Sequence, residues 1–289
     1  MIINKIYSSV YWDVKRIITE NPQFGISENQ FRQDFTSHFS EEFLVYKLLG
    51  KAYGHRNYKQ FTGVEMKAII GDTEPDYYIR NGNKLFLFEV KDSFIAGKFK
   101  QSFNVVAIEK ELKKKYYGRD EPGQEKAVKQ LVTRIKTSLE LGYPFDENYK
   151  VRSLNVYPVL IVYDINLTVP GMERALMSWF SDAMKVLNEE MAKKNIKGYK
   201  VNDLVVLHID GLCMLSEYLA AGRLKLEELI NDYLQRYRKL LSQNEGKTFA
   251  EVKANVLSTY LTFQHYVMDT ILAVPVKHRL VPRELRLLD

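Results

Sequence analysis

The stretch EPDYYIRNGNKLFLFEVKD, residues 74–92, decides which fold this chain adopts. Asn-Gly at 81–82, between two runs of apolar and aromatic residues, is a strong signal for a hairpin of two antiparallel strands. The second run ends in Glu-Val-Lys-Asp at 89–92, so charged residues directly follow an apolar strand. This ending predicts that the charges have a function at the end of the strand.

Side chains alternate along a strand, so Glu89 and Lys91 share one face of the hairpin. A turn at residues 81–82 places Asp76 diagonal to Glu89, and a turn at 82–83 places it directly opposite. Either turn brings Asp76 to the same face, whereas a three-residue turn would need a bulge to do so. Two carboxylates and an ammonium group at a strand end suit a Mg²⁺ site, because Mg²⁺ prefers hard oxygen ligands and the lysine can act on water and phosphate.

The rest of the chain alternates between helical and extended patterns. Helices are predicted at 1–30 (with a break at 20–25), 31–50, 127–139, 173–194, 212–220, 224–241 and 248–272, and strands, besides the hairpin, at 60–70, 154–165 and 203–210. The last two strands and the helix between them predict a parallel crossover.

These elements predict an α/β fold in which a mixed sheet core is flanked by helices. We expect this core at residues 31–210, after an N-terminal helical segment at 1–30 and before a helical C-terminal lobe at 211–289. At 289 residues the chain is long enough to bury a substantial interior.

Composition restricts the classes of function. The net charge of +6 and the pI of about 9.0 permit an anionic partner such as nucleic acid without requiring one. Cys213 is the only cysteine, which excludes an internal disulfide and a thiolate zinc cluster. We find no signal-peptide pattern and no apolar run long enough to cross a bilayer, so we expect a cytoplasmic protein with no membrane partner.

Pro-Asp at 75–76, followed after a hairpin by Glu-Val-Lys at 89–91, resembles the motif of the PD-(D/E)xK nuclease superfamily. The matching arrangement covers residues 31–165, about half of the chain. The resemblance implies a restriction-endonuclease-like core of αβββαβ order and a metal-dependent nuclease activity, with DNA favoured over RNA as the substrate.

The resemblance also implies a role for each residue of the motif. Asp76 and Glu89 would bind Mg²⁺, for which Mn²⁺ can substitute, and the carbonyl of Val90 is a further candidate ligand. Lys91 would act on the attacking water. The alternative is a solvated strand end at which Glu89 and Lys91 form a surface ion pair of little energetic value.

Two further candidates lie on helices, where the superfamily often places an acid and a glutamine. At 100° per residue, Glu42 lies in the middle of an apolar helical stripe and Glu41 to its side, so we expect Glu42 to face the site and Glu41 to be at the surface. Alternatively, both are first-turn acids of a helix that starts near Ser40. Gln130 matches the glutamine-containing helix but lies opposite the apolar stripe of 128–139, as an ordinary surface glutamine would.

The segment 93–123 interleaves lysines with phenylalanines, a combination that suits phosphate contacts and base stacking. For its part EKELKKK, 109–115, a solvated helix is the alternative. Two other functions compete with the nuclease. One is a non-catalytic nucleic-acid-binding or assembly subunit with a nuclease-like fold. The other is an unrelated α/β protein whose C-terminal lobe contacts a protein partner or a second copy of the chain.

Overall fold

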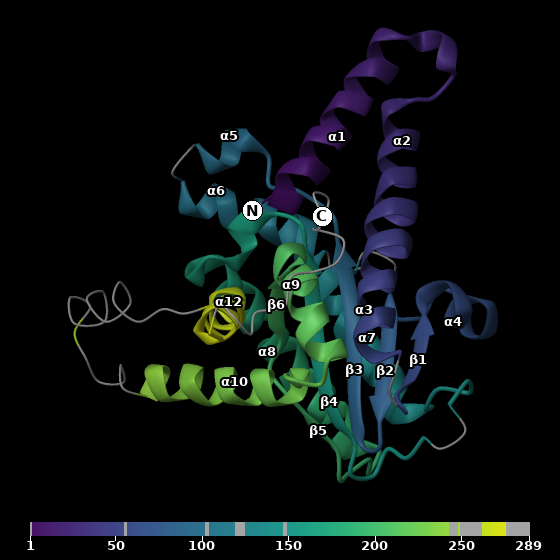
Figure 1. The fold of residues 1–289 in the computed structure, drawn as a ribbon. Coiled ribbons are helices and arrows are strands. Elements are labelled where there is room, and N and C mark those ends of the chain that lie inside the picture. The colour runs from purple at the N-terminus through teal and green to yellow at the C-terminus, as the bar shows by residue number, and fades with distance from the viewer. Residues whose placement is uncertain are drawn as a thin grey trace.

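The computed structural model describes residues 2–54, 57–101, 104–118, 125–146, 149–242, 248 and 262–275. Within these ranges the chain forms a mixed, open sheet of six strands with helices on both faces (Figure 1). The strands are β1 (Lys59–Thr62), β2 (Tyr77–Asn81), β3 (Lys84–Lys91), β4 (Asn155–Val162), β5 (Lys200–Val201) and β6 (Val205–His208).

The sheet order is β1-β2-β3-β4-β5, with β6 also paired to β4. Strands β1, β2 and β3 are antiparallel neighbours, whereas β4 runs parallel to β3, β5 and β6. The predicted parallel crossover is therefore confirmed, because β4 and β6 are parallel neighbours joined through a long helix. The carboxyl ends of β3, β4 and β6 meet at one edge of the sheet.

The hairpin turn is Gly82-Asn83. Tyr77 pairs with Phe88 and Asn81 pairs with Lys84, which is the second of the two registers that the sequence allowed. Gly82 has a positive φ of 59°, a conformation that a residue without a Cβ adopts at low cost. The paired register begins at Tyr77, and Asp76 directly precedes it.

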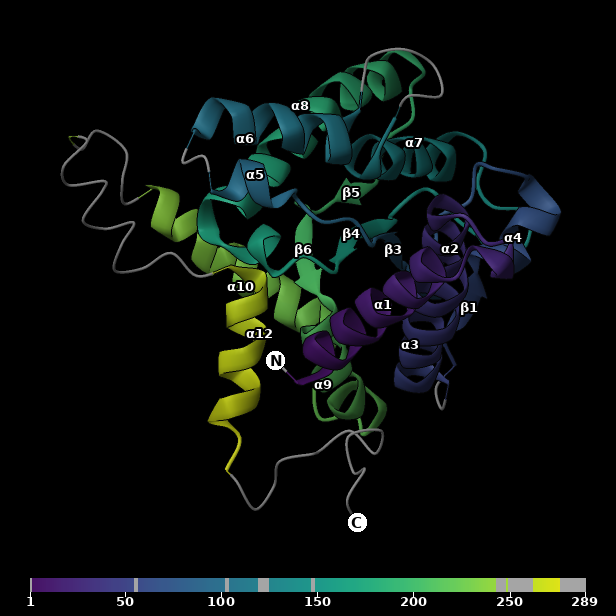
Figure 2. The same ribbon diagram turned by 90° about the horizontal axis from the view of Figure 1, so that it is seen from above.

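Helices cover the two faces of the sheet in two groups (Figure 2). One face is covered by α6 (Val105–Leu112), α7 (Ala127–Glu140) and α8 (Pro170–Lys193), and the other by α3 (Tyr46–Tyr53), α9 (Ile209–Ala220), α10 (Leu226–Ser242) and α12 (Phe263–Ala273). We call the two buried layers the α7-side core and the α3-side core. Leu85 and Leu87 of β3 point into the first, and Phe86, Phe88 and Val90 into the second.

The N-terminal part is a helical hairpin. Helix α1 (Ile2–Glu20) is followed by a short 3-10 helix (Pro22–Phe24) and by α2 (Glu28–Asp34), and both long helices extend beyond the end of the sheet (Figure 1). From α2 the helix continues as a π-helix, η2 (Phe35–Val45), and then as α3. The helix that we expected to stop at Gly50 therefore ends at Tyr53, and Gly50 lies inside it.

The predicted strand at 60–70 is wrong beyond Thr62. Strand β1 ends there and α4 (Gly63–Ile70) begins. The hydroxyl of Thr62 accepts a hydrogen bond from the N–H of Glu65, whose carboxylate accepts one from the N–H of Thr62. This capping box starts a helix although the apolar composition of the segment resembles a strand.

The predicted domain boundaries do not coincide with breaks in the structure. The boundary at 30–31 falls inside α2, and the boundary at 210–211 falls inside α9. Helices α9, α10 and α12 belong to the α3-side core together with the sheet. Much of the predicted helix at 248–272 lies outside the described residues, which include only its end as α12. No helix in the described part of the chain has the length and apolarity needed to cross a membrane.

A buried charge network holds the hairpin to the loop after α7. Asp146, 2% exposed, accepts hydrogen bonds from Arg80 (Nη2 to Oδ1, 2.6 Å) and Tyr78 (Oη to Oδ2, 2.9 Å), and forms an ion pair with Lys59 at 2.9 Å. Burial alone would raise the pKa of Asp146, but these hydrogen bonds lower it to about 2. Arg80 is itself buried, so it depends on this carboxylate.

Replacing Asp146 with Asn should therefore lower the free energy of unfolding by about 3–5 kcal/mol, because the guanidinium of Arg80 stays buried without its counter-charge. Urea denaturation at neutral pH measures this loss. The matched control is Asp72→Asn, which removes an exposed carboxylate that is paired with exposed Lys67, and it should change the free energy by less than about 0.5 kcal/mol. Equal effects of the two substitutions would contradict a structural role for the network.

Candidate active site

Strand β3 places Glu89 and Lys91 on the same face of the sheet, as side-chain alternation predicts. Both point to the α7 side, like Leu85 and Leu87, whereas Val90 points to the α3-side core. The Nζ of Lys91 lies 2.9 Å from Oε1 of Glu89. Glu89 is only 2% exposed, so the pair is not the solvated surface pair of the alternative interpretation.

Asp76 lies beside this pair, just before β2 begins. Its backbone N–H donates a hydrogen bond to the carbonyl of Phe88 (3.1 Å), the β3 residue that also pairs with Tyr77. Its carboxylate accepts a hydrogen bond from the N–H of Val90 (N to Oδ2, 2.5 Å). In an extended strand the N–H and C=O of one residue point to the same edge, so the carbonyl of Val90 also faces the Asp76 side. Asp76, Glu89 and Lys91 therefore lie together at the end of β3, and the charges of Glu89 and Lys91 act on Asp76.

Gly63 allows the chain to come close to Asp76. The N–H of Gly63 donates a hydrogen bond to the carbonyl of Asp76 at 2.8 Å. A Cβ at position 63 would lie 2.8 Å from the hydroxyl of Tyr46 and 3.1 Å from the carbonyl oxygen of Asp76. Only glycine fits without displacing one of them, so the start of α4 fixes the backbone of Asp76.

The prediction for the acids before the sheet is wrong: Glu41, and not Glu42, faces the cluster. Oε1 of Glu41 accepts a hydrogen bond from Tyr46 at 2.5 Å, and its charge interacts with those of Asp76, Glu89 and Lys91. Glu42 instead points outward, where Oε2 lies 3.0 Å from Nδ1 of exposed His38. Both acids lie on the π-helix η2, whose hydrogen bonds run from i to i+5. The wider turn invalidates the 100° spacing on which the prediction depended.

Contacts with Asp92, the residue after Lys91, fix η2 against β3. The carboxylate of Asp92 accepts hydrogen bonds from Ser40 (2.5 Å) and from Arg32 (Nη2 to Oδ1, 2.8 Å). The hydroxyl of Tyr163, which follows β4, donates to the carbonyl of Ser40 at 2.5 Å. Ser40 directly precedes Glu41, so these contacts determine where Glu41 lies. These contacts join residues far apart in the chain, so rules that use local sequence alone do not find them.

The carboxylates of the cluster outnumber its positive charges. Burial and the negative charges of Glu89 and Glu41 raise the pKa of Asp76 well above its usual value. Burial and the charge of Glu89 also raise the pKa of Glu41, against the opposing effects of Tyr46 and Lys91. Burial lowers the pKa of Lys91, but the carboxylates of Glu89, Asp76 and Glu41 outweigh it and the pKa is raised. A cation beside these acids would therefore be stabilised.

The candidate metal ligands fit a hydrated Mg²⁺. Oε2 of Glu89 is buried and has no hydrogen-bond partner, so it is free to bind an ion. In the described part of the chain no three His, Cys, Asp or Glu side chains are grouped closely enough to form a metal cage. The available set is two carboxylates, from Asp76 and Glu89, and the Val90 carbonyl. Mg²⁺ commonly uses one or two carboxylates and keeps several waters, so this small set suits it.

Gln130 lies on α7, the helix that covers the same face of the sheet as Glu89 and Lys91. Its Oε1 atom is buried and has no hydrogen-bond partner, unlike that of an ordinary surface glutamine. No hydrogen bond joins it to the cluster among the described residues. Its assignment to the site stays a prediction.

The raised pKa of Asp76 makes the protein's stability depend on pH. In the unfolded chain this acid ionises near pH 3.8, whereas in the folded protein it stays protonated to higher pH. In EDTA its contribution to the free energy of unfolding should fall as the pH rises above about 4. Asp76→Asn, whose amide oxygen can still accept from Val90, should lose less stability between pH 5 and pH 8 than the wild type in urea denaturation. The control Asp72→Asn should follow the wild type, and a matching profile for Asp76→Asn would contradict the crowding of acids at this site.

Comparisons with known proteins add no external assignment. No protein-family model, no curated protein and no solved structure matches the chain. The functional interpretation of the cluster therefore rests on its own chemistry: crowded carboxylates, an unpartnered oxygen of Glu89 and an adjacent ammonium group.

Proposed function

We propose that the chain is a metal-dependent nuclease that hydrolyses phosphodiester bonds, with DNA favoured over RNA as the substrate. The observation that carries the proposal is the grouping of Asp76, Glu89 and Lys91 at the end of β3, with one carboxylate oxygen unpartnered. Structural ion pairs are normally balanced and satisfied. This cluster has an excess of acid beside a lysine, which is the combination that metal-assisted hydrolysis uses.

The arrangement of the elements supports a restriction-endonuclease-like core. Helix α3, strands β1, β2 and β3, helix α7 and strand β4 follow the αβββαβ order that the PD-(D/E)xK resemblance implies, if α4, between β1 and β2, and the helices of 97–117, between β3 and α7, are treated as insertions. Asp76 lies at the start of the second of these strands, and Glu89 and Lys91 lie at the end of the third. We assign the chain to that superfamily as part of the proposal.

Asp76, Glu89 and the Val90 carbonyl would hold Mg²⁺, and Mn²⁺ can substitute for it. The ion would supply a Lewis acid for the phosphate and lower the pKa of a bound water. Glu41 lies at the edge of this ligand set and carries a raised pKa, so it is placed to accept a proton or to bind an ion-coordinated water. Tyr46 restrains Glu41 through its hydroxyl.

Lys91 would act as an ammonium group. Its raised pKa keeps it protonated at neutral pH, so it can donate hydrogen bonds to the attacking water and to the charge that develops on the phosphoryl oxygens. Its contact with Oε1 of Glu89 holds the Nζ atom near the ligand set and leaves Oε2 of Glu89 for the ion. Glu89 would therefore position Lys91 with one carboxylate oxygen and bind the metal ion with the other.

Incubated with DNA and Mg²⁺ or Mn²⁺, the purified protein should cleave phosphodiester bonds, and EDTA should stop the reaction. Asp76→Ala should abolish cleavage because it removes a metal ligand. Lys91→Ala should reduce the rate by about 10²–10³ while metal binding persists, because the amine acts on water and phosphate. A gel assay with end-labelled DNA and with end-labelled RNA measures the cleavage rates of the wild type and of both variants. Cleavage that survives Asp76→Ala would place the active site elsewhere, and an inactive wild type would favour the non-catalytic binding subunit.

The neighbouring acids on η2 provide a matched pair of variants for the same assay. Glu41→Gln and Glu42→Gln remove the same charge one residue apart. Because Glu41 faces the cluster and Glu42 faces solvent, the first should slow cleavage by about tenfold or more, and the second should leave the rate within about twofold. Equal rates for the two variants would exclude Glu41 from the reaction.

A further inference from the structure

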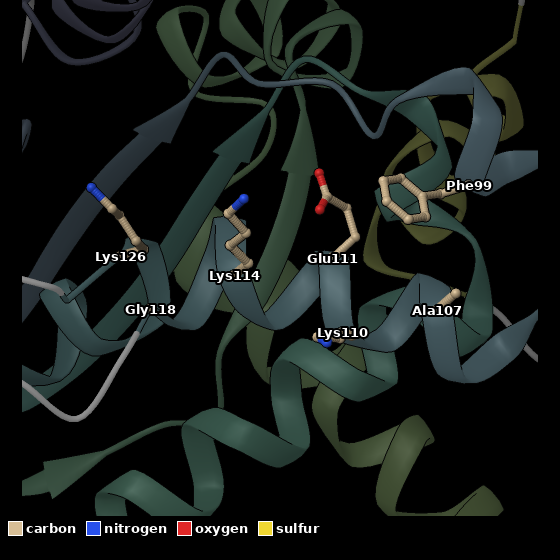
Figure 3. A pocket seen from close by; sticks show the side chains of 7 residues that line it. All are labelled: Phe99, Ala107, Lys110, Glu111, Lys114, Gly118 and Lys126. Carbon is tan, nitrogen blue, oxygen red and sulfur yellow. The ribbon is translucent and has the colours of Figure 1, made fainter.

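Apart from the metal-ligand cluster, a pocket lies among α5 (Gly97–Lys100), α6 and the π-helical segment η3 (Lys113–Tyr117). It is a cavity of about 710 Å³ whose lining includes Phe99, Lys110, Lys114 and Lys126. Figure 3 shows Phe99 at one end and Lys126 at the other, with Lys114 and Glu111 projecting between them from the same side of one helix. None of these residues belongs to the metal-ligand cluster.

Among the described residues that line the cavity, lysines outnumber acids. The carboxylate among them is that of Glu111, which is paired with Lys115 at 3.3 Å. Lys110, Lys114 and Lys126 are exposed, and within the described ranges none of their ammonium groups has an ion-pair or hydrogen-bond partner. Three unpaired ammonium groups around one concave surface create a field that attracts an anion.

The aromatic side chain and the size of the cavity restrict the class of anion. Phe99 packs against the α7-side core and also lines the cavity, so its ring is held in place. Fixed aromatic rings beside basic groups are typical of sites that stack a nucleobase and bind its phosphate. A volume of about 710 Å³ is within the range of small-molecule pockets and exceeds the need of a lone phosphate ion.

Direct contacts connect this cavity with the strand that carries the cluster. Tyr116 of η3 donates a hydrogen bond to the carbonyl of Ser93 (2.7 Å), two residues after Lys91. Lys115 donates to the carbonyl of Phe94. The segment that leaves β3 therefore runs directly from the cluster to the wall of the cavity.

We infer that this cavity binds a nucleotide unit, with the phosphate on Lys114 and Lys126 and the base on Phe99. The same chemistry describes one nucleotide of a bound strand and a free nucleotide. The version with a bound strand rests on the proposed nuclease function, because the cavity would then hold the substrate outside the cleavage site. The version with a free nucleotide is independent of that function.

The test measures binding in EDTA, so that cleavage is not required. A short fluorescein-labelled single-stranded DNA is titrated with the full chain by fluorescence anisotropy, and ATP is titrated by calorimetry. The variants are Lys114→Ala/Lys126→Ala and Phe99→Ala. The control is Lys193→Ala/Lys197→Ala, which removes the same charge from exposed positions in α8 and beyond it.

For a strand-binding cavity, the double lysine variant should raise the Kd for the oligonucleotide by about tenfold. It should also lower the slope of log Kd against log salt by about 0.7, the value for one lost phosphate contact on a single strand. Phe99→Ala should raise the Kd by about fivefold or more through lost stacking. For a free-nucleotide cavity, ATP should bind the wild type and lose affinity in the same variants. The control should behave as the wild type.

Unchanged affinities of the double lysine variant for both ligands would overturn the inference, even if Phe99→Ala fails to fold. The binding test of the cavity and the cleavage test of the nuclease function can fail independently. A wild type that binds through these residues but does not cleave DNA supports the cavity and contradicts the nuclease. If the double lysine variant cleaves DNA and binds both ligands as the wild type does, the nuclease function is supported and nucleotide binding by the cavity is contradicted.

Discussion

Electrostatic repulsion among Asp76, Glu89 and Glu41 is the constraint on which the rest of the site depends. The charges of the three acids interact at the edge of the sheet. Among the described residues, Lys91 supplies the ammonium group that contacts Glu89 and whose charge also acts on Asp76 and Glu41. A fold tolerates such crowding only when protonation or a cation relieves it. Two hydrogen bonds hold Asp76 in this position: the N–H of Val90 in β3 donates to its carboxylate, and the N–H of Gly63 at the start of α4 donates to its carbonyl. The core of the protein therefore holds the acids together against their repulsion.

Local rules predicted the centre of this site from the sequence. Strand alternation placed Glu89 and Lys91 together, and the Asn-Gly-Asn turn left two registers, both of which brought Asp76 to the same face. Choosing between the registers required the structure, because Gly82-Asn83 and Asn81-Gly82 are both acceptable turns. The start of α4 was recoverable from the Thr-x-x-Glu capping box at 62–65, which the apolar composition of 60–70 concealed.

The choice of Glu42 over Glu41 shows where local rules fail. It assumed a regular α-helix, whereas Ser40 is held by Asp92 and Tyr163 from elsewhere in the fold, and the helix widens to a π-helix around it. Gln130 is a second example. The apolar stripe on α7 predicted that its side chain lies on the opposite side of the helix, but it did not predict that the amide oxygen would be buried. The segment 93–123 was recognisable as basic and aromatic, but only the tertiary structure brings Lys110 and Lys114 to the same cavity as Phe99 and adds Lys126 from outside that segment.

The central claim is that the acid cluster is a metal site whose carboxylates give up protons when an ion binds. Calorimetric titration of Mn²⁺ at pH 7, in buffers of different ionisation enthalpy, measures the protons released per ion. Because the pKa values of Asp76 and Glu41 are raised, we expect saturable binding of Mn²⁺ with net proton release, and we expect both to be lost in Asp76→Ala. Absence of saturable binding, or binding that persists unchanged in Asp76→Ala, would contradict the account.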